Sequence, residues 1–279
     1  MRGLPLFVGC ILVLASPDRV RASQEREEEI AAHLRALDSE DEAARAAAID
    51  ALAKRGKRTA ETLIKELQSS AATGRTKTGV IEVLGKMKGT GKQLLEDALM
   101  EQIHAASIPR ITATCSAIGH AGAKAAWAAP LLIERIEKGF DRGFPDANNM
   151  VICSAIMALG QLGPTGARSH AIVRKYLEDP ALEVRLSSAC ASWWMGGEVD
   201  EAYGILLQGL EVPSQTVALE RAIFGLGEMG PRATAALPKL EALRSVVLDQ
   251  TKVTISEAVR KIEGKLPPVC PRPSSPETK

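Results

Sequence analysis

The chain has 279 residues, with 35 Lys and Arg against 34 Asp and Glu, 46% apolar residues and 3% aromatic ones. The formal net charge of +1 argues against a basic nucleic-acid-binding protein, and the apolar content argues against a disordered chain. Because aromatics are so few, small aliphatic side chains must fill the core. Such side chains suit packed helices better than a β-sandwich, so we expect an all-α fold.

Residues 1–22 have the parts of a secretory signal peptide: Met-Arg-Gly, the apolar run Leu4 to Ala15, and a polar stretch that ends at Ala22. The run is about twelve residues, whereas a membrane-spanning helix needs ~20. We therefore expect an exported chain, periplasmic or secreted, with no transmembrane segment in its mature part. Cleavage after Ala22 and retention as an anchor are both open.

The rest of the chain repeats a pattern in which an apolar helical segment ends near a glycine and a second helical segment follows. Equivalent positions fall at residues 53, 85, 119, 160 and 227, with steps of 32, 34, 41 and 67, the last being about twice 33. The missing position falls at Trp193 to Gly196. Two helices of ten to fifteen residues with their turns need about this length, and stacked neighbours bury the apolar face that each pair leaves open.

In chain order, we expect a capping helix at 24–36, six helical hairpins and a final helix at 251–264. The second helices should cover 60–67, 92–103, 126–136, 167–177 and 233–247. At each turn, the first glycine should adopt the positive φ of a helix C-cap, and the glycine three residues later should keep the turn tight. Of the adjacent Trp193 and Trp194, one should be in the core and the other near the surface, since neighbouring helical residues point about 100° apart.

This pattern resembles a known family. The stretch Ala43 to Leu52, followed by Gly56 and by Ala60 to Leu67, is similar to a HEAT repeat of the short type also called phycobilisome-lyase HEAT-like. The resemblance covers about residues 25 to 265. It implies a right-handed α-solenoid, an α-α superhelix of the armadillo/HEAT kind, that binds other macromolecules through its surface. The expected organisation is a signal peptide at 1–22, the solenoid at 23–266 and a Pro-rich, extended and mobile tail at 267–279.

Four cysteines remain beyond residue 22, and an even number in an exported chain suggests disulfides. Cys115, Cys153 and Cys190, however, each fall in the first helix of a successive unit. Stacked helices are ~8–10 Å apart, whereas bridged cysteines need Cα atoms within about 7 Å. We therefore expect buried thiols. Cys270 could form a bridge only if the tail folds back.

The sequence indicates no catalytic, cofactor-binding or metal-binding residues. Gly85 to Gln93 superficially suggests a phosphate loop but lacks its spacing, its hydroxyl and a preceding strand. The histidines His33, His104, His120 and His170 occupy different repeat positions, without the spacing of a metal site. No serine or cysteine has the surroundings of a catalytic nucleophile.

Two features are candidates for partner binding. The first is basic: residues 53–92 contain ten Lys and Arg but three acidic residues. Equivalent turns stack on one edge of a solenoid, so a positive stripe could bind an acidic protein, a polyanionic envelope polymer or a membrane surface. The other interpretation is a solvated edge. The stripe comprises Lys54, Arg55, Lys57 and Arg58, followed one unit later by Lys86, Lys88 and Lys92.

The second candidate is the long step between the third and fourth units, where residues 139–146 add about seven residues. Phe140 and Phe144 lie in this insertion. They could be exposed aromatic anchors for a partner, or they could fold down over the seam between units.

Together these features predict a monomeric, non-enzymatic protein-interaction scaffold with mixed charges on a curved array of second helices. Its partner would be a protein, with an acidic protein as one option, and not a nucleic acid. The family resemblance also implies an alternative, a lyase or lyase-associated subunit that binds a chromophore or small ligand and presents it to a partner protein. Export argues against it, because bilin attachment is expected in the cytoplasm.

Overall fold

The computed structural model describes residues 17–69, 71–88, 90–103, 107–139 and 145–269. These residues are helical apart from the connections, as expected for an all-α chain. The elements in chain order are α1 (Pro17–Leu37), α2 (Glu42–Ala53), α3 (Lys57–Gln68), α4 (Gly74–Lys86), α5 (Thr90–Ile103), α6 (Ile108–Ala121), η1 (Gly122–Ala128), α7 (Ala129–Lys138), α8 (Pro145–Gln161), α9 (Ala167–Lys175), η2 (Tyr176–Glu178), α10 (Leu182–Trp194), α11 (Val199–Gly209), α12 (Thr216–Met229), η3 (Gly230–Ala236), α13 (Leu237–Leu243) and α14 (Asp249–Ile262).

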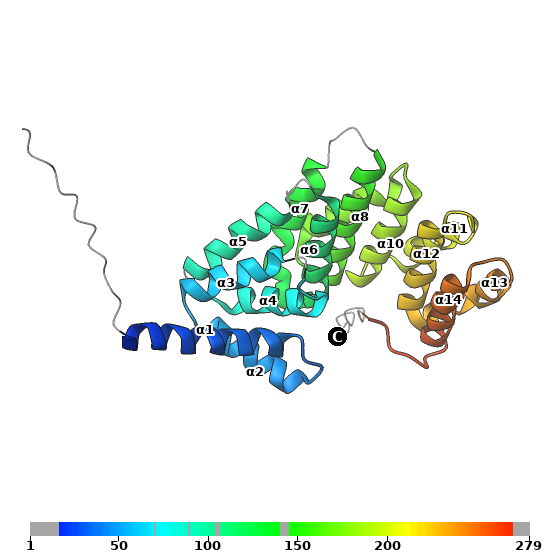
Figure 1. Ribbon diagram of the computed structural model, residues 1–279. Coiled ribbons are helices and arrows are strands. Elements are labelled where there is room, and N and C mark those ends of the chain that lie inside the picture. The colour runs from blue at the N-terminus through cyan, green and yellow to red at the C-terminus, as the bar shows by residue number, and fades with distance from the viewer. Residues whose placement is uncertain (1–16, 70, 89, 104–106, 140–144, 270–279) are drawn as a thin grey trace, which may run out of the picture.

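The described residues form six consecutive helical hairpins, with α1 before them and α14 after them (Figure 1). The hairpins are α2 with α3, α4 with α5, α6 with α7, α8 with α9, α10 with α11, and α12 with α13. The repeat prediction is therefore confirmed. Because each hairpin packs mainly on its neighbours, the chain is an α-solenoid.

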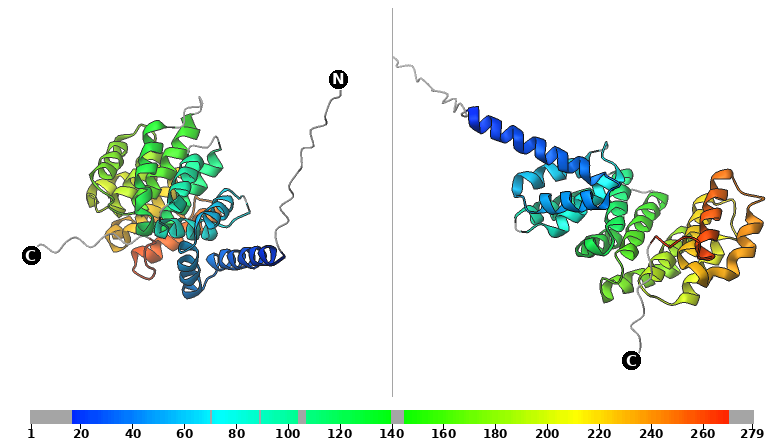
Figure 2. Two further views of the ribbon diagram at one scale, coloured as in Figure 1. Left: turned by 90° about the vertical axis from the view of Figure 1, so that its left-hand side faces the viewer. Right: turned by 90° about the horizontal axis from the view of Figure 1, so that it is seen from below.

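The first helices of the hairpins form the inner layer of this array. Each packs along the next, from α2 through α4, α6, α8, α10 and α12 to α14. The second helices are in close contact only at the start, between α3 and α5, and they separate towards the C-terminal end. The array is therefore curved, as Figure 2 shows, with the first helices on the inside. The prediction had instead emphasised the second helices as the binding face.

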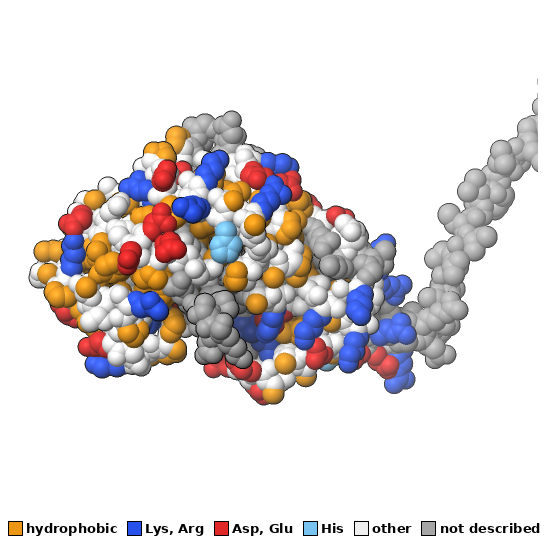
Figure 3. All heavy atoms as spheres, turned by 180° about the vertical axis from the view of Figure 1, so that it is seen from behind, with side chains coloured by type: hydrophobic (Ala, Val, Ile, Leu, Met, Phe, Trp, Pro, Cys, Tyr) orange, Lys and Arg blue, Asp and Glu red, His pale blue; other side chains and the backbone are white. Residues whose placement is uncertain are grey.

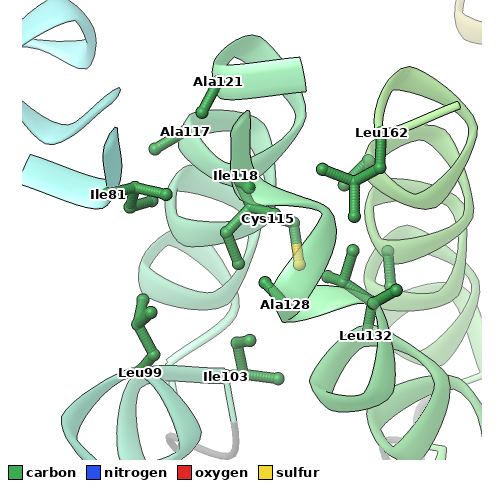
Figure 4. Packing of buried hydrophobic residues seen from close by; sticks show 14 of the residues in the cluster. Ile81, Leu99, Ile103, Cys115, Ala117, Ile118, Ala121, Ala128, Leu132 and Leu162 are labelled. Carbon is green, nitrogen blue, oxygen red and sulfur yellow. The ribbon is translucent and has the colours of Figure 1, made fainter. Parts of the chain in front are cut away.

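The core consists of two apolar clusters that meet at α10. Val184, Ala191 and Met195 belong to the cluster of the earlier hairpins, while Cys190 and Trp194 belong to that of the later ones. Alanine and other aliphatic residues dominate both clusters, as the composition indicated. Figure 4 shows part of the first cluster, where α6 packs against α4 and α8.

The prediction that one of the adjacent tryptophans would be near the surface is wrong. Trp193 and Trp194 are 5% and 2% exposed. Trp193 Nε1 donates to the carbonyl oxygen of Glu228 in α12 at 3.1 Å, and the Trp194 ring meets Phe224 edge to face at 6.0 Å. Because α10 has neighbours on several sides, two of its side chains that point 100° apart can both be buried.

The glycine roles are also the reverse of those predicted. The second glycines of the turns have the positive φ angles: 55° at Gly122, 78° at Gly163 and 58° at Gly230. The first glycines are helical and allow neighbouring helices to approach. A Cβ on Gly160, for example, would lie 2.4 Å from Ala191 Cα in α10. The close approach of two inner-layer helices therefore requires a glycine at that position.

Two second helices begin later than expected. The chain passes through the 3₁₀ segments η1 and η3 before α7 and α13 begin, and each of these helices has a proline in its first turn. The proline ring prevents an α-helix from continuing backwards through this point, because it lacks an N–H and its ring clashes with the preceding turn. As a result α13 covers Leu237–Leu243, rather than 233–247.

The first residues of the Pro-rich tail are held against the solenoid. Val269 N donates to Glu228 Oε1 at 3.0 Å, and the same oxygen accepts from Lys261 Nζ at 2.9 Å. Glu228 and Lys261 are both buried. The Val269 contact lies in the region 267–279 that was expected to be an extended and mobile tail, and that expectation stays a prediction. Cys270 and the remainder of the tail lie outside the described residues.

None of the helices within the described ranges combines the length and apolarity needed to cross a membrane.

Candidate functional site

The basic residues predicted as a stripe lie at the turns that follow α2 and α4, and several of them are paired. Arg55 forms an ion pair with Glu29 of α1, and Lys86 Nζ lies 2.6 Å from Asp50 Oδ1 of α2. The hydrogen bond from Arg55 lowers the pKa of Glu29, and the one from Lys86 lowers the pKa of Asp50. These pairs neutralise part of the predicted stripe.

Four other members of the stripe are exposed. Lys57 Nζ is 3.9 Å from Glu61 Oε1, while Lys54, Arg58 and Lys88 face solvent. On the face drawn in Figure 3, basic side chains are frequent towards the N-terminal end and acidic ones lie between them. The turn edge is therefore mixed in charge rather than uniformly positive.

Three predicted residues cannot be placed in this way. Lys92 belongs to α5, but its side chain is outside the described set. Phe140 and Phe144 lie outside the described residues, between α7 and α8.

A cationic hollow lies elsewhere, between the first helices of the first three hairpins. It has a volume of about 560 Å³ and is open to solvent. Its lining comes from α2, α4 and α6, and no carboxylate is among the described residues that line it. The polar residues of the lining are Arg45, Arg75, Lys77, Thr78, Ser116 and His120.

Arg45 is held in the hollow by the carboxylate of Glu82. Its Nη2 atom is 2.8 Å from Glu82 Oε1, and Lys124 Nζ of the third hairpin is 2.8 Å from Glu82 Oε2. The Glu82 side chain is only 5% exposed. One buried anion of the second hairpin thus links a cation of the first hairpin and a cation of the third. Arg45 Nε is buried and has no hydrogen-bond partner among the described atoms, so the guanidinium keeps a donor that is not satisfied.

The other cations of the hollow are more accessible. Arg75 Nη1 lies 3.6 Å from Glu40 Oε1 and donates to the carbonyl oxygen of Asp38 at 3.5 Å. Lys77 is half-buried and forms no ion pair with a described side chain. Both belong to the first turns of α4, where the helix dipole is positive, and Thr73 caps this end by accepting from Thr76 N. The positive charge of the hollow is therefore compensated only in part.

His120 completes the far side of the hollow. Its Nδ1 atom lies 2.8 Å from the carbonyl oxygen of Ser116, one turn earlier in α6. This short contact orients the imidazole on the exposed face of the helix, so the ring is part of the hollow wall rather than of the core.

Arg75 also marks a position that recurs along the inner layer. It lies ten residues before Gly85, one of the equivalent positions of the repeat, and the same offset can be taken from the equivalent positions 53, 119, 160, 193 and 227. We call the resulting set the inner row: Ala43, Arg75, Pro109, Met150, Glu183 and Val217, one from each first helix. Met150 and Val217 are 56% and 63% exposed, which is high for large apolar side chains.

A second, smaller hollow of about 220 Å³ lies around these apolar members of the row. Met150, Glu183 and Val217 line it together with Cys153 and Arg221. Arg221 Nη1 donates to Ser187 Oγ at 2.8 Å. The inner row therefore begins at a cationic hollow. It ends at a smaller hollow whose lining combines apolar side chains with charged ones of both signs.

The thiols near these hollows are buried and free. Burial raises the pKa of Cys115 and of Cys190 to about 12, and it also raises the pKa of Cys153. The predicted buried thiols are thus confirmed for these three cysteines. A thiol with a raised pKa carries little thiolate at neutral pH, so none of the three is set up as a nucleophile.

The described residues contain no group of three His, Cys, Asp or Glu side chains that could hold a metal ion.

Arg45, Arg75, Lys77 and His120 were not selected from the sequence as a site. Arg75 and Lys77 were only counted within the basic stretch. The signal that could have found them is a fixed distance in sequence from the equivalent positions of the repeat, because residues at the same distance share one face of the first helices. What this distance could not supply is the pairing of Arg45 with Glu82, which depends on contact between hairpins.

The sequential hairpins and the shared inner layer define this chain as a HEAT-like α-solenoid. No family model matches it, and no curated protein matches it.

Among solved structures, it is similar to the complex of CpcE and CpcF of phycocyanin lyase from Nostoc sp. PCC7120, with 19% identity, a TM-score of 0.45 and coverage of 84% of this chain and 93% of that one. It is also similar to the Escherichia coli protein YibA, with 16% identity, a TM-score of 0.35 and coverage of 89% and 97%. Human deoxyhypusine hydroxylase in complex with glycerol gives 14% identity, a TM-score of 0.36 and coverage of 87% and 99%.

Proposed function

We propose that this protein is an exported, non-enzymatic scaffold that binds a protein partner along the face of its first helices. The observation that carries the proposal is the inner row, along which a cationic hollow at α2, α4 and α6 is followed by exposed Met150 in α8 and Val217 in α12. Exposed apolar side chains beside a polar rim are typical of protein interfaces. A curved array of helices offers a long surface of this kind.

Site-specific cross-linking tests the position of the interface. A photoreactive phenylalanine analogue would replace Ala43 or Val217 in the inner row, and matched controls would replace exposed Glu137 in α7 or Glu201 in α11. After irradiation in cells, mass spectrometry identifies the captured proteins. We expect one predominant partner from the inner-row positions and little from the controls. Equal capture from both sets, or capture from the second helices alone, would contradict the proposal.

Export is supported by the pattern of residues 1–22 and has its own test. Cell fractionation followed by N-terminal sequencing should find the chain outside the cytoplasm and beginning after Ala22. A cytoplasmic chain that retains Met1 would be evidence against export.

The non-enzymatic part of the proposal is tested against the chromophore alternative. The purified mature chain is incubated with bilins and its visible absorbance is recorded. A spectrum equal to that of the bilins alone is expected, and a clear shift would overturn the scaffold assignment.

A further inference from the structure

We propose that the hollow between α2, α4 and α6 binds carboxylates of an acidic partner segment, whose apolar continuation lies against Met150 and Val217. This inference rests on the proposed scaffold function and specifies the chemistry of the partner. The segment is extended and follows the inner row from the first hairpins towards the last.

The first argument is charge complementarity in the hollow. Arg45, Arg75, Lys77 and His120 come from three helices and converge on one space of about 560 Å³. Carboxylates are suitable ligands, because guanidinium groups bind them with paired hydrogen bonds. Glu82 fixes the Arg45 guanidinium in place, and Lys77 forms no ion pair with a described side chain. An incoming carboxylate would find donors that are already in position.

The second argument is that the same row excludes a long polyanion. Further along the row, Asp146 and Glu183 line the smaller hollow. A nucleic acid or a uniformly acidic polymer would place like charges against these carboxylates. A short acidic stretch followed by apolar residues avoids this repulsion and covers Met150 and Val217 instead.

The third argument is length. Neighbouring helices lie about 8–10 Å apart, so the row from α4 to α12 extends over roughly 30–40 Å. An extended chain rises ~3.3 Å per residue. A segment of about twelve residues therefore reaches from the cationic hollow to Val217.

The test uses fluorescein-labelled synthetic peptides of twelve residues and fluorescence anisotropy with the mature full chain. The probe has four Glu, a five-residue spacer of Gly and Ser, and three Leu, and it is made in both chain directions. Comparison peptides replace Glu by Lys, or Leu by Ser. We expect one direction of the probe to bind and both comparison peptides to bind at least about tenfold more weakly, since each loses one of the two complementary parts.

Two charge reversals with the same net change separate the hollow from the turn edge. The double variant Arg75→Glu with Lys77→Glu should weaken binding of the probe by about tenfold or more at low salt. The control, Lys57→Glu with Arg58→Glu, alters two exposed residues on the adjacent turn and should change affinity by less than about twofold. Thermal melting checks that both variants fold. Equal weakening by the two variants would overturn the inference, because it would show a general effect of net charge.

A steric variant keeps the test independent of charge. Ala113→Phe places a ring in the hollow without removing a cation and should also weaken binding by about tenfold. Retention of full affinity in this variant, or equally tight binding of a twelve-residue oligothymidylate, would refute the acidic-segment assignment.

The cross-linking experiment distinguishes the two levels of proposal. Capture of a partner at Ala43 and Val217 that the Arg75 and Lys77 reversals leave unchanged would refute the carboxylate site while the scaffold function stands. Absence of capture anywhere on the inner row would remove the scaffold function itself.

Discussion

Gly160 in α8 provides a sharp test of how closely the inner-layer helices pack. An alanine Cβ at this position would lie 2.4 Å from Ala191 Cα, 2.6 Å from Ala191 Cβ and 3.0 Å from Trp194 Cε3. The nearest of these atoms belongs to the backbone of α10, so no rotation of a side chain can relieve the contact. Gly160→Ala can be accommodated only if α8 and α10 move apart.

The magnitude follows from two opposing effects. Overpacking a well-packed core costs about 1–3 kcal/mol, and a clash with backbone belongs at the upper end of that range. Alanine in a helix gains about 1 kcal/mol over glycine. The net loss in the free energy of unfolding is therefore about 2 kcal/mol. For a chain of this size the melting temperature should fall by about 4–8 °C.

The matched control is Gly204→Ala in α11. This glycine is also inside a helix, but a Cβ there has no atom within 4 Å. Only the helix-propensity gain remains, so we expect a rise of about 0.5–1 kcal/mol in stability. Thermal melting by circular dichroism and urea unfolding measure both variants. If Gly160→Ala were as stable as Gly204→Ala, the close approach of α8 and α10 would be refuted.

Three further predictions concern buried groups and a turn. Lys261→Met leaves the carboxylate of Glu228 buried without its ammonium partner and should cost about 3 kcal/mol in urea unfolding; an unchanged midpoint would argue against the pair. Burial opposes the charged form of Lys261, but hydrogen bonds to two carboxylates outweigh it and raise its pKa. The stabilisation should therefore be complete below about pH 10.4 and decline above it in the native chain, and the decline should be weaker in Lys261→Met. In the folded protein, Cys115 and Cys190 should not react with a thiol reagent at pH 8 until denaturant is added, and rapid labelling would show that these thiols are accessible. Gly163→Ala should destabilise the chain by about 1 kcal/mol or more, because φ is 78° there, and no loss in a melting experiment would contradict the left-handed turn.

Much of the candidate site was within reach of the sequence, but not in the form that was predicted. The basic residues at the turns were identified by their density, yet density does not reveal neighbours. Glu29 and Asp50 come from other helices, and they pair with Arg55 and Lys86. The hollow depends on α2, α4 and α6 lying side by side, which the sequence pattern of a single helix does not specify.

The sequence by itself determined the hairpins and their number, since helix periodicity, turn glycines and helix-starting prolines act within a few residues. Only the tertiary structure decided which glycine bends the turn and which one allows two helices to touch. It also decided that both Trp193 and Trp194 are buried, and that the first helices rather than the second form the inner face. The physical reason is that these properties depend on the rotation and separation of neighbouring hairpins. A local pattern sets the shape of one unit, while the packing of all units sets where its surface faces.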